Sequence, residues 1–322
     1  MTAPDAGRWF NVFAPASVAN VGPGFDCFGF SLGEPGDVVR ARVVGEPGVR
    51  IVAIRGSDDS PLPFEPERNT AGRAALSILA GDPDFAAHRG LELEIDKELP
   101  PCSGLGSSAA SAVAGAVAAM LALGEATDVA YDRARVLEAA LDGEEVASGS
   151  RHGDNVAPSL LGGFTIVQSV DPLNVARFEP ALPCRVAIVV PRLSIATKQA
   201  REALPKQVSL RDAVANCANA SSVVLALLTA NEALLRAAFA DRFAEPHRAK
   251  LIPGFDEAKQ AALAAGAYGC SISGSGPTLF ALAPDDVAAA RAAAAVVAAL
   301  ARHGVASRSF VTAISPQGAR RQ

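Results

Sequence analysis

A run of small residues has the composition of an anion-binding turn. Gly104 and Gly106 allow the backbone to turn tightly and to approach a ligand closely, and Ser107 and Ser108 stand where an alanine-rich helix is expected to begin. The first turn of a helix leaves backbone N–H groups free and carries partial positive charge, which favours phosphate. The residues fit a phosphate loop and a purely structural strand-to-helix turn equally well. The run comprises Pro100, Pro101, Cys102, Ser103, Gly104, Leu105, Gly106, Ser107, Ser108, Ala109 and Ala110.

Two other nucleotide-binding turns can be weighed against this one. Residues 104–109 fit the G-x-G-x-x-A dinucleotide fingerprint, but residues 97–103, with two prolines, separate them from the preceding strand. The acidic residue that this fingerprint needs about 20 residues later would be Glu125, which follows no β-branched run. A Walker-type loop is excluded because the sequence contains no Gly-Lys-Ser or Gly-Lys-Thr.

Length and charge limit the possible classes of protein. The 322 residues are enough for two domains, and the net charge of −5 favours neither nucleic acid nor an anionic membrane as a partner. Five scattered cysteines without a CxxC pair, and no recognisable signal peptide, predict a cytoplasmic location. The longest apolar run, Ala109–Leu123, is shorter than the roughly 20 residues of a membrane span, so a buried core helix is expected.

In the first half of the chain, the periodicity predicts strands and two helices around the glycine-serine loop. Asp58–Pro66 is expected to be a proline-broken loop, and Asn69 has the side chain of a helix N-cap. The expected elements are a strand at Trp9–Pro15, a turn-rich loop at 16–29, a hairpin of Val38–Val44 with Val49–Ile54, a helix at Asn69–Ala80, a strand at Leu91–Ile95 and an amphipathic helix at Tyr131–Ala147.

Proline and glycine signals between Gln168 and Pro183 predict a domain boundary, which divides the chain into residues 1–167 and 168–322. The order of elements in the second half favours helices on one face of an antiparallel sheet, and the chain as a whole an α+β fold. The expected elements are strands at Arg185–Val190, Leu279–Ala283 and Ser307–Thr312, helices over Ser209–Ala240 and Asp285–His303, and a glycine-serine turn at Gly269–Thr278.

Three separated turns resemble the motifs of the GHMP small-molecule kinases: residues 16–29, 100–110 and 272–278. The resemblance extends to the homoserine kinases of that family. It implies two domains, an N-terminal one with a phosphate-binding loop and a C-terminal ferredoxin-like α/β sandwich, with ATP and L-homoserine between them. The implied product is O-phospho-L-homoserine, on the route to threonine. The further matching segments are Ala19–Asp26, His152–Pro158, Leu161–Gly163, Thr197–Arg201 and Arg248–Gly254.

The resemblance also implies roles for individual residues at the nucleotide. The glycine-serine loop would hold the triphosphate of ATP, and Asn69 would contact adenine, as an alternative to its role as an N-cap. Glu144 and Ser108 would hold Mg²⁺, which is chemically sufficient because this ion keeps water and phosphate oxygens among its ligands. Glu145 is a rival for the role of Glu144.

Homoserine is a zwitterion, so its site needs both signs of charge. By the resemblance, Arg201 and Arg248 bind the carboxylate, since a guanidinium group can contact it with two parallel hydrogen bonds. Asp26 and Asp154 would take the ammonium group.

The resemblance places Asn20 and Asn155 beside the reacting hydroxyl. The sequence leaves open whether any side chain accepts the hydroxyl proton, and Asp154 is the candidate. His152, two residues away, is expected to be structural.

Two further alternatives remain beside homoserine kinase. Another GHMP kinase would act on a sugar or a mevalonate-type substrate, but paired arginines and paired aspartates favour an amino acid. A regulatory protein without catalysis would not need both Glu144 and the phosphate loop. A homodimer is expected from the resemblance only.

Overall fold

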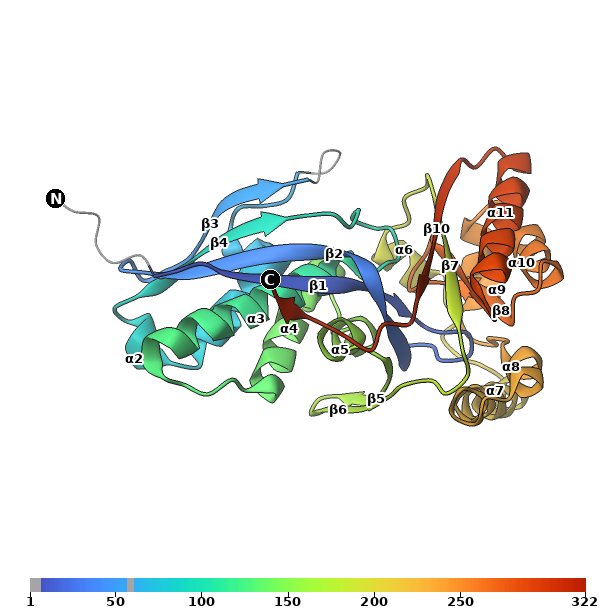
Figure 1. Cartoon of the computed structure of the whole chain (residues 1–322), viewed down its shortest axis with the longest axis horizontal. Coiled ribbons are helices and arrows are strands. Elements are labelled where there is room, and N and C mark those ends of the chain that lie inside the picture. Colours follow the sequence, from blue (N-terminus) through green and yellow to red (C-terminus); the bar gives the residue numbers. More distant parts are fainter. Residues whose placement is uncertain (1–6, 57–60) are drawn as a thin grey trace.

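The structure is a computed structural model that describes residues 7–56 and 61–322, so part of the expected loop Asp58–Pro66 lies outside the described residues. Two regions, each with its own sheet, lie side by side along the longest axis of the molecule (Figure 1). The first half of the chain forms one region, and most of the second half forms the other. The predicted α+β class is confirmed.

The N-terminal sheet has seven strands in the described ranges, with β11-β1-β2-β4-β3 in order, β5 paired with β2, and β6 paired with β5. The strand β2 is long enough to pair with β1, β4 and β5 along its length. The strands are β1 (Phe10–Ala19), β2 (Phe28–Val44), β3 (Gly48–Arg55), β4 (Gly90–Asp96), β5 (Phe164–Val170), β6 (Leu173–Phe178) and β11 (Arg320–Arg321).

The predicted hairpin between β2 and β3 is wrong. β4 lies between them, antiparallel to β2 and parallel to β3. It enters at Gly90, where an added Cβ would lie 2.1 Å from the carbonyl oxygen of Gly48, so this close passage requires glycine. The turn signals between β2 and β3 are those of a hairpin. The pairing was decided instead by β4, which begins at Gly90, 35 residues after β3 ends at Arg55.

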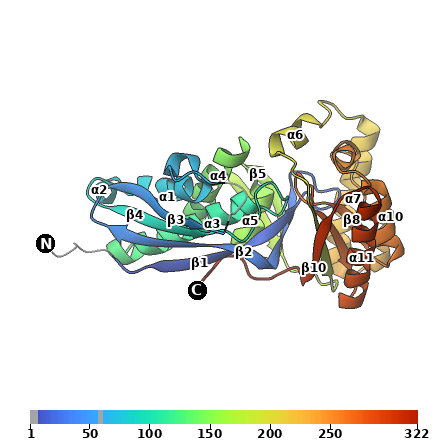
Figure 2. The same cartoon turned by 90° about the horizontal axis from the view of Figure 1, so that it is seen from above.

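Helices cover one face of the N-terminal sheet (Figure 2). The expected core helix is confirmed: α3 has the length and apolarity of a membrane span, but 83% of that stretch is buried inside the protein. Asn69 caps α1, since its Oδ1 accepts the N–H groups of Ala71 and Gly72 at 3.0 and 3.2 Å. The helices are η1 (Pro66–Arg68), α1 (Thr70–Ala80), α2 (Pro83–Ala86), α3 (Ser107–Thr127), α4 (Arg133–Ser148) and α5 (Gly153–Leu161).

The C-terminal sheet is antiparallel, as predicted, with the order β10-β7-β9-β8. Its helices α10 and α11 pack on one face around Ala187 and Ala281, whereas Ile188 and Phe280 on the other face join the core of the N-terminal region. The strand β8 occupies the start of the expected glycine-serine turn. The elements are β7 (Arg185–Pro191), α6 (Thr197–Glu202), α7 (Leu210–Thr229), α8 (Glu232–Ala238), α9 (Glu245–Arg248), η2 (Ala249–Leu251), α10 (Phe255–Ala264), β8 (Gly269–Ile272), β9 (Leu279–Ala283), α11 (Asp286–Arg302) and β10 (Ser307–Ala313).

The two regions share a continuous apolar core. The ring of Phe30 packs edge-on against that of Phe280, with 5.7 Å between their centroids. The expected division after residue 167 falls inside β5, which pairs with β2 of the N-terminal sheet. We propose that the boundary lies between Phe178 and Arg185, where the chain passes from one sheet to the other, and that the last residues return to the N-terminal sheet as β11.

Candidate active site

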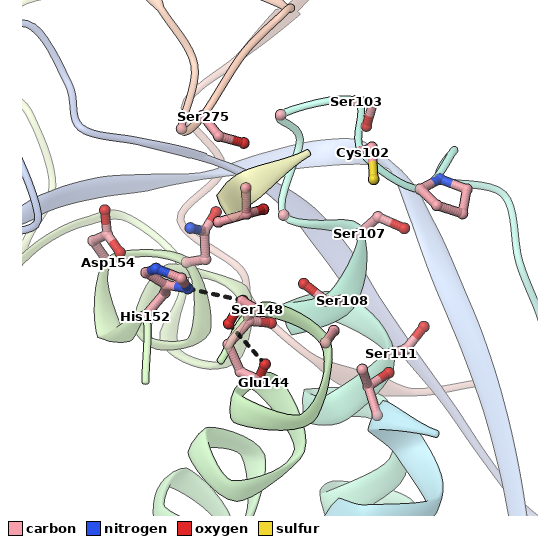
Figure 3. Close-up of a pocket in the computed structure, with 18 of the residues that line it drawn as sticks. Cys102, Ser103, Ser107, Ser108, Ser111, Glu144, Ser148, His152, Asp154 and Ser275 are labelled. Atoms are coloured by element: carbon pink, nitrogen blue, oxygen red, sulfur yellow. Dashed lines mark hydrogen bonds and ion pairs between the residues drawn. The ribbon is translucent and has the colours of Figure 1, made fainter. Parts of the chain in front are cut away.

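A cavity of about 290 Å³ lies where the two regions meet, and both contribute to its wall (Figure 3). Most of the sequence-predicted site residues line it. Four members of the predicted loop, Pro100, Leu105, Ala109 and Ala110, are not in its wall. The predicted residues that line it are Asn20, Asp26, Asn69, Pro101, Cys102, Ser103, Gly104, Gly106, Ser107, Ser108, Glu144, Asp154, Asn155, Arg201 and Arg248.

The glycine-serine loop has the conformation that its glycines allow. Gly104 and Gly106 have φ angles of 82° and 65°, in the left-handed region. A Cβ on Gly106 would lie 2.1 Å from Ser17 Oγ, and one on Gly104 would lie 2.5 Å from the carbonyl oxygen of Ser273. Any side chain at either position would therefore displace the loop. α3 begins directly after Gly106, so its free N–H groups lie at the cavity, where they can bind an anion.

The two serines at the start of α3 have different surroundings. The Ser107 hydroxyl donates to the carbonyl oxygen of Leu99 at 2.9 Å and accepts from Lys97 Nζ at 2.7 Å. The Ser108 side chain has no hydrogen-bond partner among residues 7–56 and 61–322, and it lines the cavity. Ser108 is therefore the serine whose hydroxyl is available to a ligand.

Glu144 is a buried carboxylate near the end of α4, and only 3% of its surface is exposed. Its Oε1 lies 3.1 Å from His152 Nδ1, whereas its Oε2 is buried without a hydrogen-bond partner in the described part of the chain. Figure 3 shows this end of α4 beside Ser108. Glu145 is exposed, because the next residue on a helix points to a different face. Burial therefore favours Glu144 over its rival.

His152 connects Glu144 to the substrate side of the cavity. Its Nε2 lies 3.1 Å from Arg201 Nη2. An arginine N–H donates only to an unprotonated ring nitrogen, so this contact fits the neutral ring with its proton on Nδ1, facing Glu144. Burial, the largest single influence, lowers the pKa of His152, but the hydrogen bond to Glu144 and the negative charges of Glu144, Asp154 and Asp26 together outweigh it, so the net shift is upward. Although the pKa is raised, the contact with Arg201 requires the neutral ring, because a charged ring would turn a second N–H donor toward the guanidinium group.

Arg201 and Asp26 form an ion pair across the junction of the two regions. Arg201 Nη1 donates to Asp26 Oδ2 at 2.6 Å. The ring of Phe25 lies under two guanidinium groups, 5.5 Å from that of Arg201 and 5.2 Å from that of Arg248. This aromatic face holds two like charges close together, which favours an anionic ligand between them.

Arg248 is almost fully buried, with 4% of its surface exposed. It donates from Nη1 to the carbonyl oxygen of Gly274 at 2.8 Å and from Nε to that of Ala200 at 3.3 Å. Within the described ranges it forms no ion pair with a carboxylate, and burial lowers its pKa. A buried cation at a cavity wall that is paired with no carboxylate among the described residues can bind the carboxylate of a ligand.

Asp154 lies at the start of α5 and is 2% exposed. Burial raises the pKa of its carboxyl group to about 6, although the nearby His152 acts in the opposite direction.

The two predicted asparagines, Asn20 and Asn155, each use their side-chain oxygen in a hydrogen bond within the protein. Asn20 Oδ1 accepts the N–H of Asp26 at 2.7 Å, and Asn155 Oδ1 accepts from Ser17 Oγ at 3.0 Å. Their amide N–H groups remain for a ligand.

Asn69 is used mainly as the N-cap of α1. Its oxygen accepts two backbone N–H groups, and its Nδ2 donates to the carbonyl oxygen of Pro63 at 3.0 Å. One amide hydrogen is left at the cavity wall, so a contact with adenine stays a prediction.

Sequence reasoning missed three contributors to this site. Phe25 lies inside a motif that was noted, but only the cation contacts reveal its role. His152 was expected to be structural, and its contacts to Glu144 and Arg201 join the two halves of the site. Lys97 was not singled out as a site residue. Its position, directly after a strand and shortly before the glycine-serine loop, was the signal that could have indicated it.

Comparisons with known proteins assign the chain to a family. Residues 69–163 match the family described as GHMP kinases N terminal domain, and residues 224–302 match the family described as GHMP kinases C terminal. A homoserine kinase of Xylella fastidiosa (strain M12) is 44% identical over 321 residues, which are 99% of this chain and 95% of the relative. The chain belongs to the homoserine kinases of the GHMP kinase family. It is thus an ATP-dependent small-molecule kinase.

Solved structures agree with this membership. The crystal structure of homoserine kinase from Cytophaga hutchinsonii superimposes on this GHMP kinase with a TM-score of 0.89 at 41% identity, and the match covers 98% of this chain and 97% of the other. A mevalonate kinase of L. major has a TM-score of 0.68 at 16% identity over 95% of this chain and 96% of the other, which shows the shared fold alone. The predicted family, fold and enzyme class are confirmed.

Proposed function

We propose that this GHMP kinase transfers the γ-phosphoryl group of ATP to the side-chain hydroxyl of L-homoserine. The observation that carries the substrate assignment is the ion pair of Asp26 with Arg201, beside the buried Arg248 and Asp154. These groups place both signs of charge in the same cavity as the phosphate loop. The homoserine kinases of Xylella and Pyrococcus abyssi, both 44% identical to this chain, support the assignment.

A zwitterion can replace the internal ion pair group for group. Its carboxylate can take the place of Asp26 at Arg201 and also reach Arg248, while its ammonium group takes the place of Arg201 at Asp26. Each buried or half-buried charge then keeps a partner, which matters because an unpaired charge in a closed site is costly. An acceptor that lacks either charge would leave one of these residues unpaired.

The residues around Glu144 fit a magnesium ion. Its Oε2 is a buried oxygen without a partner among the described residues, and the free Ser108 hydroxyl lines the same cavity. One carboxylate and one hydroxyl suit Mg²⁺, which takes its remaining ligands from phosphate and water. When bound, the ion supplies neutralisation of charge on the phosphates. The chain itself contributes the oriented Oε2, because His152 holds the other carboxylate oxygen.

Binding of the triphosphate is assigned to the start of α3. Phosphoryl transfer depends chiefly on positioning and charge stabilisation, and backbone N–H groups on a rigid loop provide both. The turn after β8 fastens this loop, since Ser273 Oγ donates to the carbonyl oxygen of Gly104 at 2.6 Å. The C-terminal region therefore touches the phosphate loop directly as well as supplying the arginines.

Asp154 has two proposed roles, as a partner of the ammonium group and as acceptor of the hydroxyl proton. Because the pKa of its buried carboxyl is about 6, the acceptor role requires pH above that value. We expect kcat/KM to fall about tenfold per pH unit below this pKa. The Asp154→Asn enzyme should be slower and lose this acid limb, as measured by initial rates from pH 5 to 8.

The same profile separates the two roles. A proton acceptor lowers kcat as it becomes protonated, whereas an ammonium ligand raises the KM for homoserine and leaves kcat unchanged. An acid limb that persists in Asp154→Asn would assign the titration to another group and remove Asp154 from proton transfer.

The acceptor is tested by ADP release from Mg-ATP with a panel of alcohols. L-homoserine should stimulate release, and mevalonate, galactose, 4-hydroxybutyrate (no ammonium) and 3-aminopropanol (no carboxylate) should not. Strong stimulation by one of the other acceptors, with none by homoserine, would refute the proposed substrate.

A cytoplasmic location stays a prediction from the scattered cysteines, and a homodimer stays a prediction from the family. The helix α7 has a long apolar stretch of which only 22% is buried, and it exposes Leu210, Val214 and Leu225. Light scattering during gel filtration measures whether the chain forms a dimer in solution.

A further inference from the structure

A buried ion pair lies behind the phosphate loop. Lys97 directly follows β4 and has a side chain that is 3% exposed, and Asp37 on β2 is fully buried. Lys97 Nζ lies 2.5 Å from Asp37 Oδ2. Removing two charges from water is unfavourable unless their remaining hydrogen-bonding capacity is also satisfied. The neighbours of this pair satisfy it, and they lie at the two ends of the loop.

Asp37 holds the segment that enters the loop. The backbone N–H groups of Glu98 and Leu99 both donate to its Oδ1 at 3.1 Å. These two residues come immediately before Pro100. The carboxylate therefore fixes the position from which the loop starts.

Lys97 holds the segment that leaves the loop. Its Nζ donates to Ser107 Oγ at 2.7 Å, to the carbonyl oxygen of Ser107 at 3.0 Å and to Ser111 Oγ at 2.9 Å. Ser107 Oγ in turn donates to the carbonyl oxygen of Leu99 at 2.9 Å, which joins the two ends of the loop directly. The ion pair thus sets the distance between the loop's entry and the first turn of α3.

The ammonium group is already saturated. It has three N–H donors, and four oxygens surround it: Asp37 Oδ2, both oxygens of Ser107, and Ser111 Oγ. Its charge is balanced by Asp37. Lys97 therefore differs from a lysine that binds phosphate as a point charge, although it lies in the cavity wall.

We propose that the Lys97–Asp37 pair is a positioning device for ATP: it aims the N–H groups at the start of α3 toward the triphosphate without touching the nucleotide. This inference rests on the proposed use of the loop for ATP. A pair that only stabilised the fold would affect stability alone. A lysine that bound phosphate would become a stronger ligand once its counter-charge was removed.

The first test removes both charges together. Lys97→Met with Asp37→Asn leaves no unpaired charge, and the asparagine oxygen can still accept from Glu98 and Leu99. We expect binding of AMPPNP, measured by calorimetry without homoserine, to weaken by about tenfold or more, as for the loss of a charged hydrogen bond. The KM for homoserine should stay within about twofold of wild type, a difference too small to reflect a lost contact. A folded double variant with wild-type AMPPNP affinity would overturn the proposal.

The second test uses variants that separate the explanations. Asp37→Asn alone frees the lysine charge, so AMPPNP should bind more weakly if Lys97 positions the loop and more tightly if it binds phosphate. Lys97→Arg keeps the charge pair, but its planar group cannot reach the same four oxygens, so weaker AMPPNP binding at a near-normal melting temperature is expected. Wild-type affinity in Lys97→Arg would contradict positioning even if the double variant failed to fold.

A matched control comes from the same two strands. Arg42 on β2 pairs with the buried Glu92 on β4, with 2.6 Å between Nη2 and Oε2. Arg42→Met with Glu92→Gln removes this pair and should leave AMPPNP affinity unchanged; an equal loss there would reduce the Lys97–Asp37 effect to general destabilisation. If wild-type enzyme bound no AMPPNP, the proposed function itself would fail, whereas equal binding by wild type and variants refutes only the positioning role.

Discussion

Glu144→Gln is expected to lower kcat by at least about 100-fold, the effect of losing one preorganised charge at a transition state. The glutamine keeps the shape of the side chain and can still face His152, but it removes the negative charge from the unpartnered Oε2. The magnesium requirement should rise as well. Initial rates of ADP release across a series of Mg²⁺ concentrations measure both effects.

Glu145→Gln is the matched control, because Glu145 lies on the same helix and is exposed. It should behave as wild type. If Glu144→Gln had a normal kcat at ordinary Mg²⁺, Glu144 would have no part in metal binding, and its unpartnered oxygen would need another explanation.

Arg201→Lys is expected to raise the KM for homoserine by about 10- to 100-fold, since hydrogen bonds to charged groups contribute roughly 1.5–3 kcal/mol each. Lysine keeps the charge but lacks the planar group that contacts Asp26 and His152 and that would contact the homoserine carboxylate in place of Asp26. The KM for ATP should not change, because the phosphate loop receives no contact from Arg201. Steady-state kinetics with each substrate varied in turn measure the two constants.

Arg192→Lys serves as the control, because Arg192 is an exposed arginine that precedes the same short helix, α6. Both Michaelis constants should be those of wild type there. Equal losses of ATP and homoserine affinity in Arg201→Lys would mean that this residue holds the two regions together instead of binding the substrate.

The prediction of the fold was correct for features that interactions between residues close in sequence decide. Alternation in β4, the apolar run of α3 and the N-cap at Asn69 each depend on residues within a few positions of one another. The hairpin of β2 and β3 failed, because the strand that separates them comes from a distant part of the chain. Local turn signals report where the chain bends, but not which strand fills the space beside it.

The same limit applies to the site. Glu144 and Glu145 are nearly equivalent in sequence, and only the packing of α4 buries the first and exposes the second. Asp26 and Arg201 are 175 positions apart, so their ion pair could not be derived from spacing. The resemblance named both residues as substrate ligands, but it gave no sign that they bind one another.

The sequence by itself determined the conformation of the glycine-serine turn, because glycines at 104 and 106 permit left-handed backbone angles that other residues rarely adopt. It also determined the family, through motifs spread along the chain. Only the tertiary structure decided what surrounds that turn. Asp37 binds its entry, Lys97 binds its exit, and Ser273 donates a hydrogen bond to the carbonyl oxygen of Gly104. The reason is physical, since a backbone conformation is fixed by neighbouring atoms, whereas the pairing of buried charges is fixed by which distant strands and turns pack together.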